Sequence, residues 1–332
     1  MKKDDLLFSI AGSLGRTTII KDDVLPANTN QALAIIRFDE NHDFNLNFIE
    51  SRLNTHDIAK YIFQNLAVGA QPNLNLQQVG NISINVPSYL EQEKIQNFID
   101  KVNKKIELLE KKHDSYVNFK KYLMQQIFAQ KLRFDFENDW VEFTLGDIGE
   151  IYNGLSGLSK NNFEKGNSRY ITYKSIFDNN VLIEDLTEPV DLNNKSQNNV
   201  EKGDLFFTGS SETPEEVGMV SVLDFNIEDC YLNSFCFGYR LNDLTKINPI
   251  FLAYYLRSPI MRNNIQILAQ GSTRFNLSKK EILKLKINIP DNEEQIKILN
   301  LMQNNDQLLK NTQNQITEMN LFKKSLLQQM FV

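Results

Sequence analysis

The sequence predicts an α+β fold in which a mixed domain followed by one long helix occurs twice. Three observations predict it: an internal repeat, two long heptad patterns, and short strand-like segments separated by polar turns. The 332 residues suffice for two or three domains, and 41% hydrophobic with 23% charged residues is typical of a globular protein. The predicted boundaries are 1–87 for a first, partial domain, 88–135 for the first helix, 139–290 for the second domain and 291–332 for the second helix.

The internal repeat is visible at an offset of 203 residues, which places Pro87 on Pro290 (290 − 87 = 203). Residues 72–129 then align with 275–332 without a gap, and roughly 17 of about 58 positions are identical. With small gaps the repeat extends back to Lys3–Phe8, which resembles Lys202–Phe207. The second copy begins earlier, near Trp140, so we expect the first domain to lack roughly its first 60 residues by comparison.

Each copy is predicted to pass from a strand into a long helix. Ile82–Val86 and Leu285–Ile289 alternate and contain β-branched residues, which favours strands. Capping signals follow at Ser88 and Asp291, each with a glutamate three residues later. Apolar residues then recur for about five heptads without Pro or Gly. Some 40 residues span roughly 60 Å, more than a small domain, so we expect the two helices to pair. The alternative is that each packs only on its own domain.

The remaining segments predict an irregular mixed domain. Ser168–Ile176 and Asp204–Thr208 are expected to be strands, and Asn153-Gly154 is a turn signal. Pro249–Arg257 is expected to be a helix, with Phe48–Leu53 as its counterpart in the first copy.

The motifs of catalysis are missing from the sequence. It contains no dinucleotide-binding glycine motif and no phosphate-binding loop, and Asn248-Pro249-Ile250-Phe251 lacks the second proline of the amino-methyltransferase motif. Two cysteines and three scattered histidines do not make a zinc site. We therefore expect a non-enzymatic protein without a cofactor. No window predicts a membrane helix or signal peptide. Because the two cysteines lie in one segment and do not suggest a disulfide framework, a cytoplasmic location is expected.

Local charge favours a nucleic-acid partner. The net charge of −6 argues against a non-specific nucleic-acid coat, but residues 257–286 contain seven basic residues and one acid, Glu281. Two segments combine cations, hydroxyls and aromatic rings, Arg169–Lys174 and Gly271–Lys280; the alternatives are a surface strand and a solvated loop. The candidate DNA-contact residues are Arg169, Tyr170, Tyr173, Lys174, Ser272, Thr273, Arg274, Asn276, Lys279 and Lys280, with Gln71 and Asn73 in the first copy.

These motifs together resemble the specificity subunits of Type I restriction–modification systems. The resemblance rests on Trp140-x4-Leu145-Gly146-Asp147-Ile148, Lys202–Phe206, Gly271–Leu277, and Ile287–Pro290 with its downstream Glu294-Gln295, and it covers nearly all of the chain. It implies two target-recognition domains, the first truncated at its N-terminal end, that each read half of a split double-stranded DNA site. It also implies an antiparallel coiled coil of the two helices, which sets the spacing of the half-sites.

The partners implied by the resemblance are methyltransferase subunits and a restriction motor–nuclease subunit. The alternatives are a stand-alone DNA-binding or decoy subunit, and a coiled-coil scaffold without a DNA role. The DNA target cannot be deduced from the sequence.

Overall fold

The computed structural model describes residues 1–39, 43–66, 72–134, 138–183, 186–193 and 195–331. They form two compact units, which we call unit 1 (Met1–Asp114 with Lys310–Val332) and unit 2 (Ser115–Leu309). Both long helices therefore contribute to both units. The four-part division predicted from the sequence stays a prediction. No helix among these residues has the length and apolarity needed to cross a membrane.

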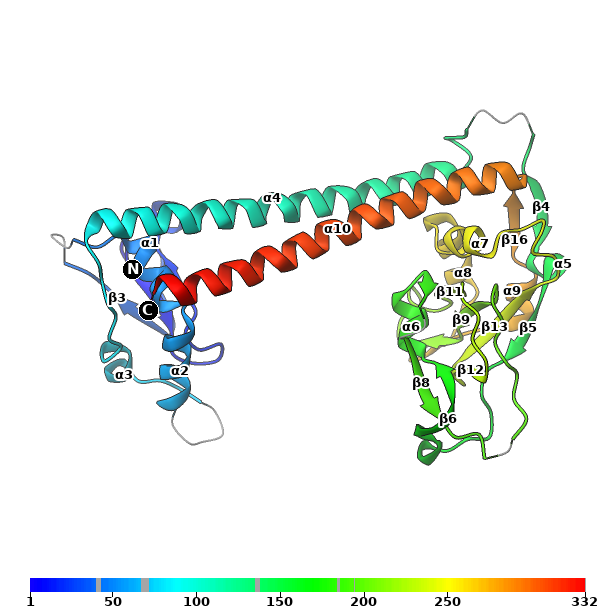
Figure 1. The fold of residues 1–332 in the computed structure, drawn as a ribbon, viewed down its shortest axis with the longest axis horizontal. Coiled ribbons are helices and arrows are strands. Elements are labelled where there is room, and N and C mark those ends of the chain that lie inside the picture. Colours follow the sequence, from blue (N-terminus) through cyan, green and yellow to red (C-terminus); the bar gives the residue numbers. More distant parts are fainter. Residues whose placement is uncertain (40–42, 67–71, 135–137, 184–185, 194, 332) are drawn as a thin grey trace. The chain divides into compact units, whose positions relative to one another are not determined.

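The two long helices are α4 (Tyr89–Phe128) and α10 (Asn292–Met330), and they contact each other side by side (Figure 1). In unit 1, His113 Nδ1 lies 3.1 Å from Thr312 Oγ1. In unit 2, Lys120 forms an ion pair with Asp306. The residue numbers of the contact partners on α10 decrease as those on α4 increase, so the two helices are antiparallel. The predicted pairing of the helices is confirmed.

Unit 2 is built on a five-stranded sheet in the order β5-β13-β9-β11-β7, which is antiparallel except for β11 and β7. Its strands are β5 (Gly149–Asn153), β13 (Cys236–Leu241), β9 (Leu205–Thr208), β11 (Val220–Leu223) and β7 (Val181–Leu182). Smaller sheets contain β12 (Cys230–Leu232), β6 (Phe163–Ile171) and β8 (Thr187–Val190); β10 (Ser210–Ser211), β15 (Phe275–Leu277) and β14 (Ala269–Gln270); and β16 (Lys286–Ile289) with β4 (Val141–Thr144).

The helices of unit 2 surround these sheets. They are α5 (Leu145–Ile148), α6 (Tyr173–Asp178), α7 (Pro249–Leu256), α8 (Pro259–Ile267) and α9 (Lys279–Leu283), with a 3-10 turn η2 (Lys160–Asn162). The main core joins α7 and the strands to the end of α4 and the start of α10. Phe128 of α4 stacks on Tyr255 of α7 with ring centroids 4.9 Å apart. The end of one helix and the start of the other thus complete one core.

Unit 1 is smaller and has one sheet in the order β2-β1-β3. Its elements are β1 (Leu6–Ser9), β2 (Thr17–Ile19), a 3-10 turn η1 (Asp22–Val24), β3 (Leu33–Ile36), α1 (Leu46–Leu53), α2 (His56–Gln64) and α3 (Leu76–Gly80). Its core includes the start of α4 and the end of α10. The ring centroids of Phe331 and Phe48 of α1 lie 5.2 Å apart. In unit 2, the ring centroids of Phe128 and Phe251 form the equivalent pair at 5.9 Å.

The repeat seen in the sequence is also a structural repeat. Helices α1, α2 and α3 begin 203 residues before α7, α8 and α9 (249 − 46, 259 − 56 and 279 − 76). The order β2-β1-β3 matches β11-β9-β13. Gln92 donates to the carbonyl of Pro87 and accepts from the amide of Asn45, both at 2.9 Å. Gln295 makes the same two bonds, at 3.0 and 2.8 Å, to the residues 203 positions later.

A buried carboxylate is paired with an arginine in each unit. Asp5 accepts two bonds of 2.6 Å from Arg37, and Asp204 accepts two of 2.7 Å from Arg240. Both aspartates are 1% exposed. In each unit the pair ties the residue before a central strand to a neighbouring strand or its end: Arg37 follows β3, and Arg240 lies in β13.

One predicted strand is too long and another is wrong. Ser168–Ile176 is a strand only to Ile171, because Thr172 caps a helix there by accepting from the amide of Ser175 at 3.0 Å. Ile82–Val86 forms no strand, and no described segment pairs with it, whereas its counterpart β16 pairs with β4. Alternating apolar residues indicate a segment that can form a strand, but the strand forms only where a neighbouring segment pairs with its backbone.

Candidate nucleic-acid interface

The loop Gly271–Lys280 forms the tip of a hairpin and the start of a helix. Gly271 has φ +138°, and a Cβ there would lie 2.0 Å from the carbonyl oxygen of Arg274, so the tight turn between β14 and β15 requires glycine. Ser272 and Thr273 at the tip are exposed. The turn therefore presents hydroxyls and backbone groups to solvent.

Arg274 is held at the mouth of a pocket in unit 2. Its guanidinium carbon lies 5.6 Å from the ring centroid of Phe235, a cation–π contact that restricts the side chain. The pocket has a volume of about 380 Å³, and it is lined by Tyr173, Phe177, Ser210, Ser211, Glu212, Glu216, Phe235 and Arg274.

The second predicted segment reaches the same pocket through α6. Tyr173 donates its hydroxyl to the carbonyl of Ser210 at 2.8 Å and stacks on Phe177, with centroids 6.2 Å apart. Burial raises the pKa of Tyr173, so its hydroxyl stays protonated. Lys174, next on the helix, is exposed. The structure thus brings Tyr173 and Arg274, about a hundred residues apart in the chain, to one site.

Lys279 contributes to a second, polar pocket of about 360 Å³. Its ammonium group donates to the side chain of Asn153 and lies 5.7 Å from the ring centroid of Phe237. Partial burial lowers the pKa of Lys279. Ser234 and Cys236 line this pocket and Phe235 lines the first. The two pockets therefore flank one loop, the connection between β12 and β13.

The other candidates of the hairpin are exposed, and those of β6 are engaged within the fold. Asn276 and Lys280 are exposed. Arg169 donates to the side chain and the carbonyl of Thr187 on the neighbouring strand. Tyr170 is 8% exposed and donates to Glu188 at 2.8 Å. Arg169 and Tyr170 stabilise the β6–β8 pair and leave little free chemistry for a ligand.

In unit 1 the structure describes one of the two candidates. Asn73 forms a β-bridge with Ala11 and lines a pocket of about 470 Å³. Gln71 lies outside the described residues.

Part of the predicted basic patch is structural. Arg257 donates to three backbone carbonyls of residues 176–179, and Arg262 donates to three of residues 215–218. Burial lowers the pKa of each arginine to about 10. Arg257 thus holds the end of α6, which contains Phe177, and Arg262 holds the loop that contains Glu216; both of these residues line the first pocket. Lys284 and Lys286 pair with Glu281 and Glu142, which leaves Arg274, Lys279 and Lys280 as the cations of this stretch nearest the pockets.

Sequence reasoning missed Phe235, which lines the first pocket although it is 57% exposed. The available signal was an aromatic residue inside the polar turn Asn233–Phe235. It also missed Glu212 and Glu216, whose segment shows no pattern before the fold places it beside Arg274.

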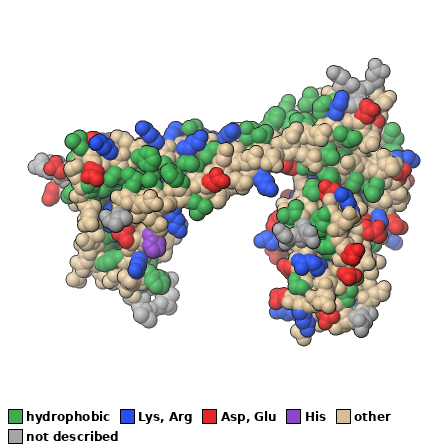
Figure 2. All heavy atoms as spheres, in the orientation of Figure 1, with side chains coloured by type: hydrophobic (Ala, Val, Ile, Leu, Met, Phe, Trp, Pro, Cys, Tyr) green, Lys and Arg blue, Asp and Glu red, His purple; other side chains and the backbone are tan. Residues whose placement is uncertain are grey.

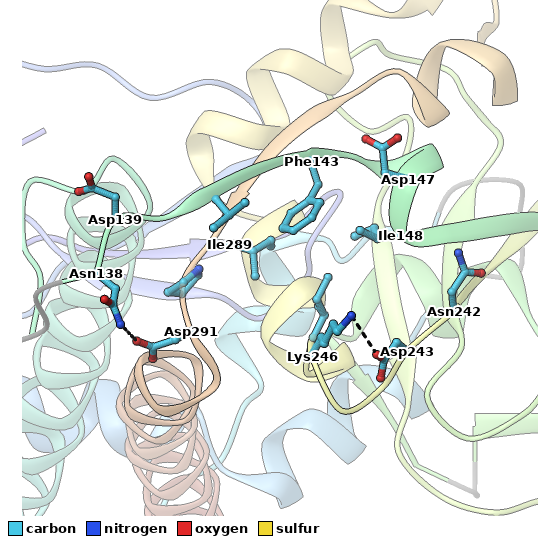
Figure 3. A pocket seen from close by; sticks show the side chains of 13 residues that line it. Asn138, Asp139, Phe143, Asp147, Ile148, Asn242, Asp243, Lys246, Ile289 and Asp291 are labelled. Carbon is cyan, nitrogen blue, oxygen red and sulfur yellow. Dashed lines mark hydrogen bonds and ion pairs between the residues drawn. The ribbon is translucent and has the colours of Figure 1, made fainter.

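A larger pocket of about 640 Å³ lies beside β4 and β16, and its rim is acidic (Figure 3). Each of three aspartates has a local role: Asp147 accepts from the amide of Thr144, Asp243 from that of Thr245, and Asp291 from that of Glu294. Negative charge on this rim disfavours contact with phosphate.

The surface mixes charges of both signs, and Figure 2 shows basic and acidic side chains interspersed over unit 2. Within the described part of the chain, no group of three or more His, Cys, Asp or Glu is arranged to hold a metal ion.

The family follows from comparison with known proteins. The model of the Type I restriction modification DNA specificity domain matches residues 1–115 and 137–318. The chain belongs to this specificity family. The EcoBI specificity subunit of Escherichia coli is 25% identical over 141 residues, which are 42% of this chain and 29% of that protein. The match thus spans less than a third of that relative.

Solved structures of specificity subunits share the fold. The subunit from M. genitalium covers 99% of this chain and 83% of its own length, at 16% identity and a TM-score of 0.54. The HsdS subunit from Thermoanaerobacter tengcongensis covers 100% and 81%, at 17% identity and a TM-score of 0.55. A chain described in work on complex assembly of the type I R-M system has a TM-score of 0.70, with 16% identity over 100% and 82%. The α+β fold with paired long helices is therefore that of the specificity family, whose subunits are non-catalytic.

Proposed function

We propose that this specificity-family chain directs the methyltransferase and restriction subunits of a Type I system to a bipartite double-stranded DNA site. In this proposal unit 2 reads one half-site, unit 1 takes part at the other, and the antiparallel helices set the spacing between them. The observation that supports it best is the convergence of Tyr173 and Arg274 on one pocket of unit 2.

The chemistry of the hairpin Gly271–Leu277 suits the major groove. Arg274 offers a planar fork of donors that matches the paired acceptors of guanine, and Asn276 offers the donor and acceptor that match adenine. Ser272, Thr273, Lys174 and the pair Lys279/Lys280 would contact phosphate. Phosphate contacts fix the position of a protein on the duplex, while base contacts specify the sequence.

The proposal is tested by DNA binding of variants at several salt concentrations, on a site identified by methylome sequencing of a host with and without the gene. Arg274→Ala is expected to weaken binding of the specific site by about 1–3 kcal/mol. Lys286→Ala is the matched control, because it removes one positive charge in the same stretch but outside both pockets. Equal effects of the two variants would contradict a specific role for Arg274.

The proposed partners would dock on the exposed face of α4. Large apolar side chains recur on one face of this helix and remain 43–71% exposed: Leu90, Phe98, Leu108, Phe119 and Tyr122. Figure 2 shows hydrophobic side chains at the surface along the long helices. Phe119→Asp is expected to abolish co-purification with a methyltransferase subunit encoded beside the gene. Asn118→Asp, exposed on the same turn, is the control. Retained co-purification of both variants would exclude this face.

A further inference from the structure

Phe235 is an exposed aromatic ring on a fixed loop of unit 2. Among the described residues from 138 to 291, it is the only exposed aromatic side chain. Its backbone is engaged on both sides: the amide donates to Asn233 Oδ1 at 2.9 Å, and the carbonyl accepts from the amide of Gly209 at 2.8 Å. The loop is therefore held in place while the ring faces solvent. Residues that bind ligands commonly lie on loops fixed in this way by a rigid scaffold.

The two pockets beside Phe235 differ in charge. The described residues that line the second pocket include Lys279 and no carboxylate, so this pocket favours a phosphate group. The first pocket contains Arg274 together with Glu212 and Glu216, and the carboxylates disfavour phosphate there. Carboxylates and a guanidinium instead suit the amino groups and the acceptors on base edges. The loop that carries Phe235 thus lies between a place for the DNA backbone and a place for bases.

The contact of Phe235 with Arg274 limits which base pair the ring can reach. Arg274 would lie in the plane of a guanine when its fork bonds both acceptors of that base. The ring centroid of Phe235 is 5.6 Å from the guanidinium carbon, whereas successive bases along a strand are about 3.4 Å apart. The ring therefore reaches the base pair next to that guanine. Thymine alone presents an apolar group, its 5-methyl, in the major groove.

We propose that Phe235 selects a thymine, through contact with its 5-methyl group, in the base pair next to the guanine bound by Arg274. Burying the methyl group against the ring removes apolar surface from water on both partners. Cytosine at this position, which lacks the methyl group, would leave the ring exposed. This inference rests on the proposed function and deepens it by naming one base of the half-site that unit 2 reads.

The test measures binding of the full chain to duplexes of the site identified by methylome sequencing, each with one thymine replaced by uracil. Uracil keeps the hydrogen-bonding groups of thymine and lacks only the methyl group. At one thymine beside a guanine, the replacement should weaken binding by the wild type roughly fourfold, as expected for one buried methyl-sized group. Phe235→Ala should bind the thymine and uracil duplexes of that position equally.

The ratio of the two affinities is the readout, because Phe235→Ala also frees the side chain of Arg274. A weaker guanine contact lowers the affinity for both duplexes by the same factor and leaves their ratio unchanged. Leu244→Ala is the matched control, since it removes an exposed apolar side chain of unit 2 outside both pockets. This variant should keep the difference of the wild type.

Three results would overturn the inference: a site without a thymine beside a guanine, no uracil that weakens binding, or a difference that persists in Phe235→Ala. Weaker binding of every duplex by Phe235→Ala, without an effect of uracil, would show that the ring inserts between bases rather than selecting a methyl group. Failure of the proposed function is a separate result, in which the wild type binds its site no better than a duplex of scrambled sequence. That result would overturn this inference as well.

Discussion

At the scale of single residues, the buried aspartates that directly precede β1 and β9 are expected to affect stability strongly. Asp204 is 1% exposed and depends on Arg240 for two of its hydrogen bonds. A buried carboxylate that loses its cation remains desolvated and charged without compensation.

Arg240→Met is therefore expected to lower the free energy of unfolding of unit 2 by about 3 kcal/mol. Lys202→Met, which removes an exposed pair with Asp224, should change it by less than about 1 kcal/mol. Urea denaturation followed by circular dichroism measures both. Similar midpoints for the two variants would show that the buried pair contributes little.

The two cysteines give a pH-dependent prediction. Burial raises the pKa of Cys230 to about 11 and that of Cys236 to about 12, above the ordinary value of 9.0. Because the folded pKa values are raised, the thiols contribute stability below about pH 9, and this contribution is lost as pH rises toward 11–12.

We expect neither thiol to react with iodoacetamide at pH 8 until urea unfolds unit 2. Between pH 8 and pH 10 the wild type should lose more stability than a chain with Cys230→Ala and Cys236→Ala, which has no thiol to titrate. Rapid labelling of the folded chain at pH 8 would contradict the burial of these groups.

Chemistry at the site was only partly predictable from single residues. The sequence predicts Arg274, Tyr173 and Lys279 as contact residues because each lies in a short segment that combines cations, aromatic rings and hydroxyls. Phe235 was missed because it approaches Arg274 only after β13 and β15 have formed, and Arg257 was assigned to a basic patch although it binds backbone carbonyls. Sequence shows which groups are present, but their partners depend on long-range contacts.

At the scale of elements, the long helices were predictable because a heptad pattern is local and repeats for many turns. On α10, one buried residue has a polar side chain that is expected to lower stability. Asn305 is 3% exposed, and neither polar atom of its side chain has a hydrogen-bond partner among the described residues.

Asn305→Leu is expected to raise the free energy of unfolding by about 1 kcal/mol, because it replaces unsatisfied polar atoms with an apolar side chain of similar size. The exposed neighbour Asn304→Leu is the control and should have little effect. The midpoints of urea denaturation of the two variants and the wild type measure these changes. A destabilised Asn305→Leu chain would indicate that Asn305 fixes the pairing of the helices.

Short strands were less predictable than helices. The apolar run Asp204–Thr208 is enough to predict a strand. The pattern in Ser168–Ile176 predicts a strand that is too long, because a threonine that caps a helix is also a good strand residue. Ile82–Val86 has the same pattern as β16 and a different structure. The difference lies in the neighbouring segment, which a local pattern does not contain.

At the scale of the whole molecule, each unit's core contains the start of one long helix and the end of the other. Phe331 of α10 packs on Phe48 in unit 1, and Phe128 of α4 packs on Phe251 in unit 2. The stability of each unit therefore depends on two aromatic residues that lie far apart in the sequence.

Phe128→Ala and Phe331→Ala are each expected to cost about 3–5 kcal/mol, but in different units. Trp140 is the only tryptophan of the chain and lies in unit 2, so its fluorescence reports unfolding of that unit. Phe128→Ala should shift the tryptophan transition to lower urea, and Phe331→Ala should leave it in place while lowering the hydrogen-exchange protection of α1. A tryptophan transition that moves equally in both variants would mean that the two units unfold as one.

Because each unit contains parts of both long helices, the chain is a candidate for circular permutation. Residue 1 and Phe331 both belong to unit 1, where the two ends of the ribbon are marked in Figure 1. A linker between the two ends, with new ends opened between α4 and β4, would interrupt none of the helices and strands that the structure describes. Such a circular permutant is expected to fold, since the cores depend on which segments meet and not on where the chain starts.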